Sequence, residues 1–166
     1  MADTMRDSVD HFLDQWTAQR SDLDLEAMGA VARLLRLSRL VNTQVGRYFA
    51  EHAMETWEFD VLATLRRSGR PLTPKELATS VMISSAALTN RVDRLDASGY
   101  VTRQAVPNDR RSLHITLTDK GRELIDKTVE GHVRNQRKII SSLSDDDCDE
   151  LNRVLRTLLV SLGDTR

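Results

Sequence analysis

The residues between Ser84 and Arg94 carry hydroxyl, amide and guanidinium groups at helical spacing. Because successive residues of a helix turn by about 100°, Ala86, Asn90, Asp93 and Arg94 point roughly opposite the apolar Leu88, Val92 and Leu95. A helix with one apolar side and an outer face of small and polar residues suits a DNA major groove, although any amphipathic surface helix also has a polar face. The candidate DNA-contacting residues here are Ser84, Ser85, Ala86, Thr89, Asn90 and Arg94.

A second group of candidates follows a turn-forming Pro-Asn dipeptide. The flanking segments 101–106 and 113–117 have strand-like composition, so the sequence predicts a β-hairpin with two arginines near its tip. A hairpin behind a recognition helix is a wing, and an arginine at its tip can enter the minor groove, whose negative potential attracts it. The other interpretation is an ordinary solvated hairpin. The candidate DNA-contacting residues here are Asp109, Arg110 and Arg111.

Chemistry other than DNA contact finds little support. Metal ligands would have to come from four histidines and the single Cys148, which show neither the i, i+4 His spacing nor the CxxC spacing of a metal site. There is no glycine-rich phosphate loop and no GxSxG motif. Cys148 has no second cysteine to pair with, and the aspartates before it disfavour its thiolate. We therefore expect no enzyme activity, no metal and no cofactor, with Cys148 in the core.

Two short helices must position the first group. Thr73 and Glu76 form a capping box, in which each side chain accepts the other residue's backbone N–H, and Pro74 at the first helical position loses no hydrogen bond. Ser84 caps the next helix and Gly99 ends it. With so few residues between them, the two helices are predicted to form a helix-turn-helix.

Apolar stripes predict further helices on both sides: 6–19, 25–51, 57–68 capped by Thr56, 119–142 after Thr118, and a last helix after Ser144. The terminal helices are too long for a winged-helix core to bury, so their stripes need another surface. A second copy of the chain is the simplest one, and a monomeric helical cap over the core is the alternative.

The predicted fold class is therefore mainly α: a winged helix-turn-helix core with a small β-hairpin wing and long N- and C-terminal dimerisation helices. Residues 1–53 would hold the N-terminal helices, which serve dimerisation and part of a ligand pocket. Residues 54–118 would form the DNA-binding domain, and residues 119–166 the C-terminal dimerisation helices.

The formal net charge of −1 at first argues against a nucleic-acid partner. The charges are unevenly placed, however: residues 66–111 have nine Lys and Arg against four Asp and Glu, whereas the rest of the chain has 15 against 21. Positive charge thus collects where contact with DNA phosphates requires it. No apolar run approaches a membrane span and no secretory segment opens the chain, so we expect a soluble cytoplasmic protein without a membrane partner.

The chain resembles the MarR family of bacterial winged-helix regulators. The resemblance rests on LTPKELA at 72–78, SSAALTNRVDRLDASGYV at 84–101, PNDRRS at 107–112 and LTDKGREL at 117–124. It implies a two-fold dimer formed by the terminal helices. It also implies a wing in which Asp109 orients the neighbouring arginines and Arg111 enters the minor groove.

Within that family, HFLDQW at 11–16, WEFDVL at 57–62 and TNRVDRL at 89–95 resemble the urate-responsive subgroup, which has an extra N-terminal helix. This resemblance implies a ligand site formed by Trp16, Asp60 and Arg91. Arg91 lies about 70° from the apolar centre of its helix, so it can turn inward while Asn90 faces outward. On sequence alone Trp16 could equally be a core residue, Asp60 could serve the helix dipole, and Arg91 could touch phosphate.

The predicted function is a ligand-responsive, DNA-binding transcriptional repressor. It would bind double-stranded DNA at a palindromic operator as a homodimer, and a small aromatic or anionic effector such as urate would release it. The alternative is a constitutive or architectural winged-helix DNA-binding protein without an effector. A concave site with polar groups converging in a mostly apolar wall would distinguish the two.

Overall fold

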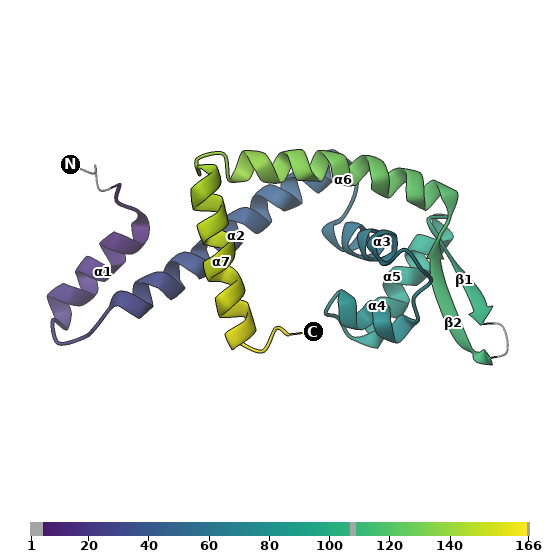
Figure 1. Cartoon of the computed structure of the whole chain (residues 1–166), viewed down its shortest axis with the longest axis horizontal. Helices are drawn as coiled ribbons and strands as arrows, with labels where there is room; N and C mark the ends of the chain where they lie inside the picture. The colour runs from purple at the N-terminus through teal and green to yellow at the C-terminus, as the bar shows by residue number, and fades with distance from the viewer. Residues whose placement is uncertain (1–4, 107–108, 166) are drawn as a thin grey trace. The chain divides into compact units, whose positions relative to one another are not determined.

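The computed structural model of the chain describes residues 5–106 and 109–165, and the side chains of residues 106–112 lie outside the described part. Its elements (Figure 1) are α1 Ser8–Gln19, α2 Glu26–Glu51, α3 Thr56–Ser68, α4 Pro74–Ser80, α5 Ser85–Ala97, β1 Val101–Val106, β2 Asp109–Leu117, α6 Asp119–Ile139 and α7 Asp145–Ser161. Helices with one two-stranded antiparallel sheet confirm the predicted fold class. The chain forms two compact units, Met1–Gln44 and Val45–Arg166. The predicted functional division at residues 53 and 118 stays a prediction.

Side-chain caps explain where α4 to α7 begin. The Thr73 hydroxyl accepts the backbone N–H of Glu76 (3.2 Å), and the Glu76 carboxylate accepts that of Thr73 (2.8 Å). Ser84, Thr118 and Ser144 cap α5, α6 and α7, each accepting the backbone N–H three residues further on. Each cap satisfies a donor that the helix itself leaves free. The predictions of these four starts are confirmed.

Two other predicted starts were wrong by one or two residues. Helix α1 begins at Ser8 rather than Arg6, because the Asp7 carboxylate caps it. Glu55 rather than Thr56 is the N-cap of α3, because the carboxylate of the third helical residue accepts the backbone N–H of Glu55 at 2.9 Å. A residue's type alone does not show which of two adjacent polar residues will adopt the extended cap conformation.

Two further boundaries also differ from the prediction. Helix α6 ends at Ile139 rather than 142, because the N–H groups of Ser141 and Leu143 bond to carbonyls three residues back, which tightens and ends the helix. Strand β2 begins at Asp109 rather than 113, and its register against β1 shifts between Ala105 and Val106. The hairpin is therefore longer than its alternating apolar residues suggested.

The wing is attached at its base to the helix-turn-helix. Val101 pairs with Leu117, and Arg103 with Ile115, across the hairpin. On its other edge Ile115 exchanges both backbone hydrogen bonds with Leu72, at 3.2 and 2.8 Å, in the segment that precedes α4. Backbone pairing on both sides of Ile115 fixes where the wing leaves the domain.

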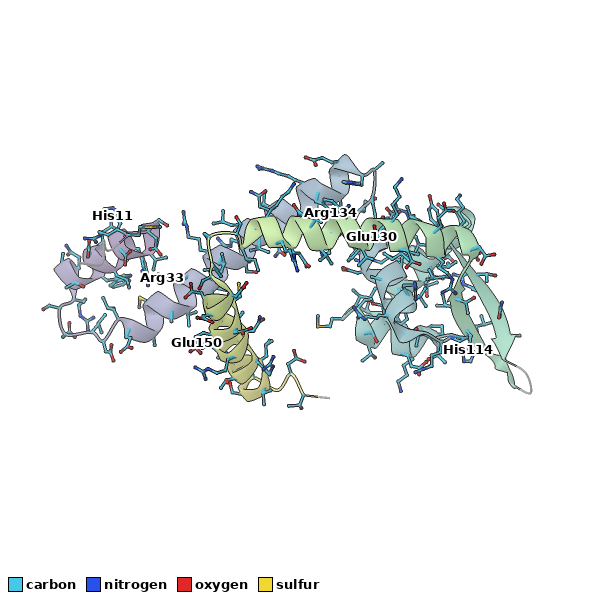
Figure 2. All side chains as sticks on the ribbon, turned by 45° about the horizontal axis from the view of Figure 1, so that its top comes forward. His11, Arg33, His114, Glu130, Arg134 and Glu150 are labelled. Carbon is cyan, nitrogen blue, oxygen red and sulfur yellow. The ribbon has the colours of Figure 1, made fainter. Side chains whose placement is uncertain are left out.

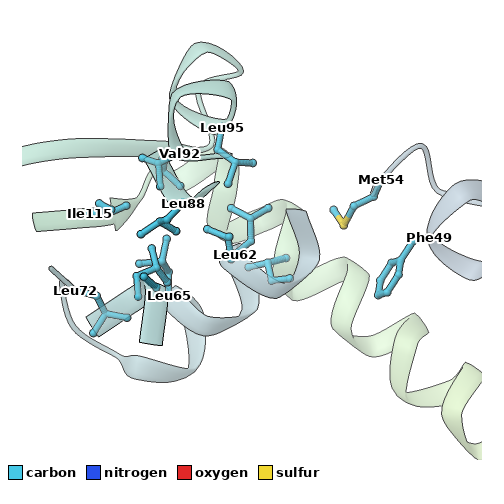
Figure 3. Close-up of a cluster of buried hydrophobic side chains, with 14 of the residues drawn as sticks. Phe49, Met54, Leu62, Leu65, Leu72, Leu88, Val92, Leu95 and Ile115 are labelled. Atoms are coloured by element: carbon cyan, nitrogen blue, oxygen red, sulfur yellow. The ribbon is translucent and has the colours of Figure 1, made fainter. Parts of the chain in front are cut away.

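A single apolar core joins the end of α2, α3, α4, α5, the wing and the start of α6 (Figure 3). Its most deeply buried members are Phe49, Val61, Leu62, Leu77, Leu88, Val92, Leu95, Val101, Ile115 and Ile125. The apolar sides predicted for α3 and α5 both contribute to this cluster. Burial of these side chains holds one side of α5 inward and leaves its other side available.

The start of α6 lies against the segment that follows α5. A Cβ added to Gly121 would lie 2.0 Å from the backbone oxygen of Tyr100. That oxygen also accepts the backbone N–H of Thr118 at 3.0 Å, and the Thr118 hydroxyl donates to the backbone oxygen of Gly99 at 2.7 Å. Only glycine permits this approach.

Terminal helices α1 and α2 pack on each other within the first unit. Arg33 of α2, which is labelled in Figure 2, pairs with the carboxylates of Asp7 (2.8 Å) and Asp10 (2.6 Å). Val9 of α1 is buried. Many large apolar side chains nevertheless remain exposed on α2 and α7, including Val31, Leu35, Leu37, Leu40, Val154, Leu158, Leu159 and Val160. Cys148 is only partly buried, so its predicted core position was wrong for the single chain. None of the described helices is long and apolar enough to cross a membrane.

Where α2 ends against α6, His132 lies in an aromatic cluster. Only 8% of its surface is exposed, and its ring lies 5.1 Å from that of Phe49 and 4.7 Å from that of Phe59. Within the described residues Nδ1 has no hydrogen-bond partner. Burial lowers the pKa of His132, and the nearby charge of Asp60 opposes that shift only in part.

His132 should therefore make stability depend on pH. As pH falls below about 6.5, the unfolded chain binds the proton first because its His pKa is higher, so this loss of stability begins there and continues down to the lowered folded pKa. His132→Phe keeps an aromatic ring and should flatten the pH dependence of the urea midpoint, whereas exposed His11→Phe should not. An unchanged dependence in His132→Phe would contradict this assignment.

Candidate nucleic-acid interface

The outer face of α5 presents the predicted polar residues to solvent. The turn before it is tight: Met82 has φ +54°, and the Ile83 N–H bonds to the Ala78 oxygen at 3.1 Å. Leu88, Val92 and Leu95 are buried, whereas the predicted DNA-contacting residues of this segment are all exposed, namely Ser84, Ser85, Ala86, Thr89, Asn90 and Arg94. This arrangement has the form expected of a helix that enters a groove.

Two of these residues have the chemistry to contact base edges. The Thr89 hydroxyl donates to the backbone oxygen of Ser85 at 3.0 Å, which leaves its oxygen lone pairs available as acceptors. The Asn90 amide makes no hydrogen bond within the described part of the chain and offers both a donor and an acceptor. An amide of this kind can bind adenine in two places at once.

Arg94 has a different environment from the one that its helical position suggested. Its guanidinium lies 4.6 Å above the ring of Trp57 and donates to Glu55 Oε1 at 3.0 Å. Both partners belong to the start of α3. Arg94 is thus exposed, as predicted, but it is drawn to the flank of α5.

Another arginine, in the first strand of the wing, connects the wing to α5. Arg103 of β1 donates to the carboxylate of Asp93 and lies 3.6 Å from that of Asp96. Sequence reasoning missed this residue. The available signal was its alternation with Val101, which places Arg103 on the same side of the strand as that buried residue although Arg103 itself is exposed.

The three candidate residues of the wing are described by their backbone alone. The backbone of Asp109, Arg110 and Arg111 belongs to β2. Their side chains lie outside the described residues, as do Pro107 and Asn108 altogether. Their predicted roles in DNA contact stay predictions.

A pocket of about 600 Å³ opens beside α5. Its walls come from the end of α2, the start of α3, the turn between α4 and α5, and α5 itself. They comprise Gly46, Ala50, Met54, Glu55, Thr56, Trp57, Asp60, Val81, Ile83 and Arg91. Two of the three predicted ligand residues, Asp60 and Arg91, are therefore brought together. Trp57 was missed, although it lies three residues before Asp60 and so shares its helix face.

The positive charges near Asp60 do not fully compensate for the burial of its carboxylate in the pocket. Desolvation raises the pKa of Asp60, and the positive charges of Arg91 and Arg67 offset this only in part. Within the described residues Asp60 and Arg91 form no ion pair, so Arg91 keeps donors available and lies 5.6 Å from the Trp57 ring. A planar anion would find here both an aromatic surface and a guanidinium.

Trp16, the third predicted ligand residue, belongs to the other compact unit. It lies on α1, and 39% of its surface is exposed, so it is not a core residue of the single chain. Its membership of the ligand site stays a prediction. No group of three His, Cys, Asp or Glu side chains that could hold a metal ion occurs in the described part of the chain.

Comparison with known proteins gives this geometry a context. The sequence profile of the MarR family matches residues 56–113, which run from α3 into the wing. The HTH-type transcriptional regulator PecS of Dickeya dadantii (strain 3937) is 39% identical over 149 residues, covering 89% of this chain and 90% of PecS. The chain belongs to the MarR family.

Solved MarR-family structures share the fold described above. AbsC of Streptomyces coelicolor matches with a TM-score of 0.76 and 26% identity, covering 86% of this chain and 98% of AbsC. Sco3205 of the same organism, solved in complex with DNA, matches with a TM-score of 0.76 and 27% identity, covering 86% of this chain and 91% of Sco3205. This MarR-family protein is a DNA-binding transcriptional regulator and not an enzyme.

Proposed function

We propose that this regulator is a repressor that binds a palindromic operator as a homodimer and leaves it when a small aromatic or anionic effector, such as urate, binds. The observation that carries this proposal is the pocket beside α5. Arg91 belongs both to the pocket and to α5, so a molecule that binds Arg91 acts directly on the helix with the candidate DNA-contacting face. A constitutive DNA-binding protein needs no ligand site beside its DNA-contacting helix, so this pocket favours the ligand-responsive function.

Exposed apolar side chains on α2 and α7 support the homodimer. Large apolar side chains exposed along a helix mark an interaction site, and a second copy can cover the same surface on both chains at once. Two-fold symmetry would then present two α5 helices about one turn of DNA apart, roughly 34 Å, which is why the operator should be a palindrome.

The three proposed ligand residues would have distinct roles. Arg91 would bind an anionic oxygen, and Trp16 would offer a flat apolar wall to a planar ring. Asp60 repels an anion unless it is protonated, and its raised pKa makes protonation easier, so anion affinity should rise as pH falls through that pKa. In the free protein Asp60 attracts Arg91. An anion that takes Arg91 ends this attraction and allows α5 to turn.

We expect urate to weaken operator binding by about 1–3 kcal/mol, the usual size of such coupling, and operator DNA to weaken urate binding by the same factor. Fluorescence anisotropy with labelled operator would measure the release and show two chains per operator. Trp16→Ala should abolish release and leave DNA affinity intact, whereas Phe12→Ala on the same helix should retain release. Arg91→Ala should also abolish release, which is scored against the variant's own DNA affinity because Arg91 belongs to α5.

Either of two outcomes would contradict the effector site: urate-induced release that survives Trp16→Ala, or wild type that urate does not release. In the second case a thermal-shift screen of purines, phenolic acids and small carboxylates would identify another effector, because a ligand that binds only the native state raises its melting temperature. Absence of any effector would leave the constitutive DNA-binding protein as the function.

A further inference from the structure

We propose that Glu55 and Trp57 form a seat for Arg94 that fixes the orientation of α5 for DNA binding, so that they are positioning residues that need not touch DNA. The inference rests on α5 being the DNA-reading helix of the proposed function. In this seat the Glu55 carboxylate accepts hydrogen bonds from both Trp57 and Arg94. Glu55 Oε2 accepts the indole N–H of Trp57 at 2.6 Å, and Glu55 Oε1 accepts from Arg94 at 3.0 Å.

The bond from Trp57 to Glu55 determines which way the indole ring faces. With its N–H held by Glu55, the ring turns one face toward α5, where the guanidinium of Arg94 lies 4.6 Å and that of Arg91 5.6 Å from its centre. Arg91 and Arg94 are three residues apart on one helix face, so both reach the same ring. Two hydrogen bonds lower the pKa of the Glu55 carboxyl group. The bond from Trp57 has the larger effect and the bond from Arg94 the smaller.

The seat belongs to the start of α3, a helix that is held in place by its buried residues. Helix α3 continues from Trp57 into the core through Val61, Leu62 and Leu65, all buried. The buried side of α5 consists of three aliphatic residues, and on the wing side Arg103 pairs with Asp93, so the flank that faces α3 depends on the seat to limit rotation about the helix axis. A bond from the flank of α5 to α3 restrains that rotation and hence the direction in which Thr89 and Asn90 point.

Simple electrostatics predicts the opposite effect for Glu55. A carboxylate beside a DNA-binding face repels phosphates, so its neutralisation should strengthen binding, or leave it unchanged where salt screens it. If Glu55 merely competed with DNA for Arg94, its neutralisation would likewise strengthen binding. Only a positioning role makes Glu55→Gln weaken binding, so the sign of the effect separates these explanations.

The experiment measures operator affinity of the full chain by anisotropy over a range of salt concentrations. Glu55→Gln should weaken binding by about two- to fivefold per half-site, the range expected of an exposed ion pair or cation–π contact. The matched control is Glu51→Gln. Glu51 is exposed at the end of α2, and its carboxylate makes no hydrogen bond or ion pair in the described part of the chain. Its loss should not weaken binding.

Two further measurements separate positioning from general loss of structure. In a Trp16→Phe background the fluorescence of Trp57 should change on Glu55→Gln, while the urea midpoint should stay close to that of wild type. In an Arg94→Gln background Glu55→Gln should have no further effect on affinity, because the seat is then already empty. The seat would be contradicted if Glu55→Gln bound operator as tightly as wild type or more tightly. It would also be contradicted if the losses of affinity in Glu55→Gln and Arg94→Gln added fully in the double variant.

Failure of the seat can be told apart from failure of the underlying function. Asn90→Ala and Thr89→Ala should alter sequence preference more than overall affinity if α5 reads DNA. If they change preference and Glu55→Gln does not weaken binding, the seat alone is wrong. If they leave preference unchanged, α5 is not the reading helix, and the seat is rejected with that assignment.

Discussion

Gly121→Ala should destabilise the protein by about 3 kcal/mol or more, at the upper end for an added methyl group in a packed site. The new Cβ would lie 2.0 Å from the backbone oxygen of Tyr100. That oxygen cannot retreat freely, because it accepts the Thr118 N–H that fastens the start of α6. Urea unfolding followed by circular dichroism would measure the loss as a lower midpoint at unchanged slope.

Gly46→Ala provides the matched control. A Cβ at Gly46 would meet no atom within 4 Å, and Gly46 lies inside α2, where alanine should stabilise the helix by roughly 0.5–1 kcal/mol. The two substitutions should therefore move the midpoint in opposite directions. If Gly121→Ala unfolded at the wild-type midpoint, the close approach of α6 to Tyr100 would be wrong.

Arg111→Ala should weaken operator binding by about 1–3 kcal/mol per half-site, which is roughly five- to 150-fold. The reason is the loss of a guanidinium from the negative potential of the minor groove. In anisotropy titrations over a range of salt concentrations, the slope of log affinity against log salt concentration should also fall by about one.

Arg134→Ala, which removes the same charge from an exposed position on α6, should have a much smaller effect on operator binding. Wild-type affinity of Arg111→Ala at every salt concentration would show that the wing does not carry the proposed contact. An equal loss in both variants would show that net charge rather than a groove contact controls binding.

Much of the fold was predictable because helix starts are local events. Thr73, Ser84, Thr118 and Ser144 each cap a helix through a hydrogen bond to a neighbour three residues away, and the sequence displays both partners. Helix ends depend on weaker preferences, and α6 accordingly ended earlier than predicted. The hairpin was predicted from its turn and its alternation, but the register shift near Val106 has no such local signal.

The candidate site was predictable only where one helix determined it. The outward position of Asn90 and the flanking position of Arg91 follow from helical geometry alone. The environment of Arg94 does not, because it depends on how α3 packs beside α5, which brings residues 39 positions apart into contact. Asp60 and Arg91 were placed together by family resemblance, and the shared pocket agrees with it.

The exposed apolar residues of α2 and α7 also bear on how the protein is made. The ribosome produces α2 well before α7, and the winged-helix core between them has all its members once Ile125 has been added. A nascent chain can thus complete its DNA-binding part while the apolar side chains of α2 are still uncovered. If the chain forms the proposed homodimer, neighbouring nascent chains on one messenger would expose α2 to one another during that interval, so we expect pairing between chains from the same polysome.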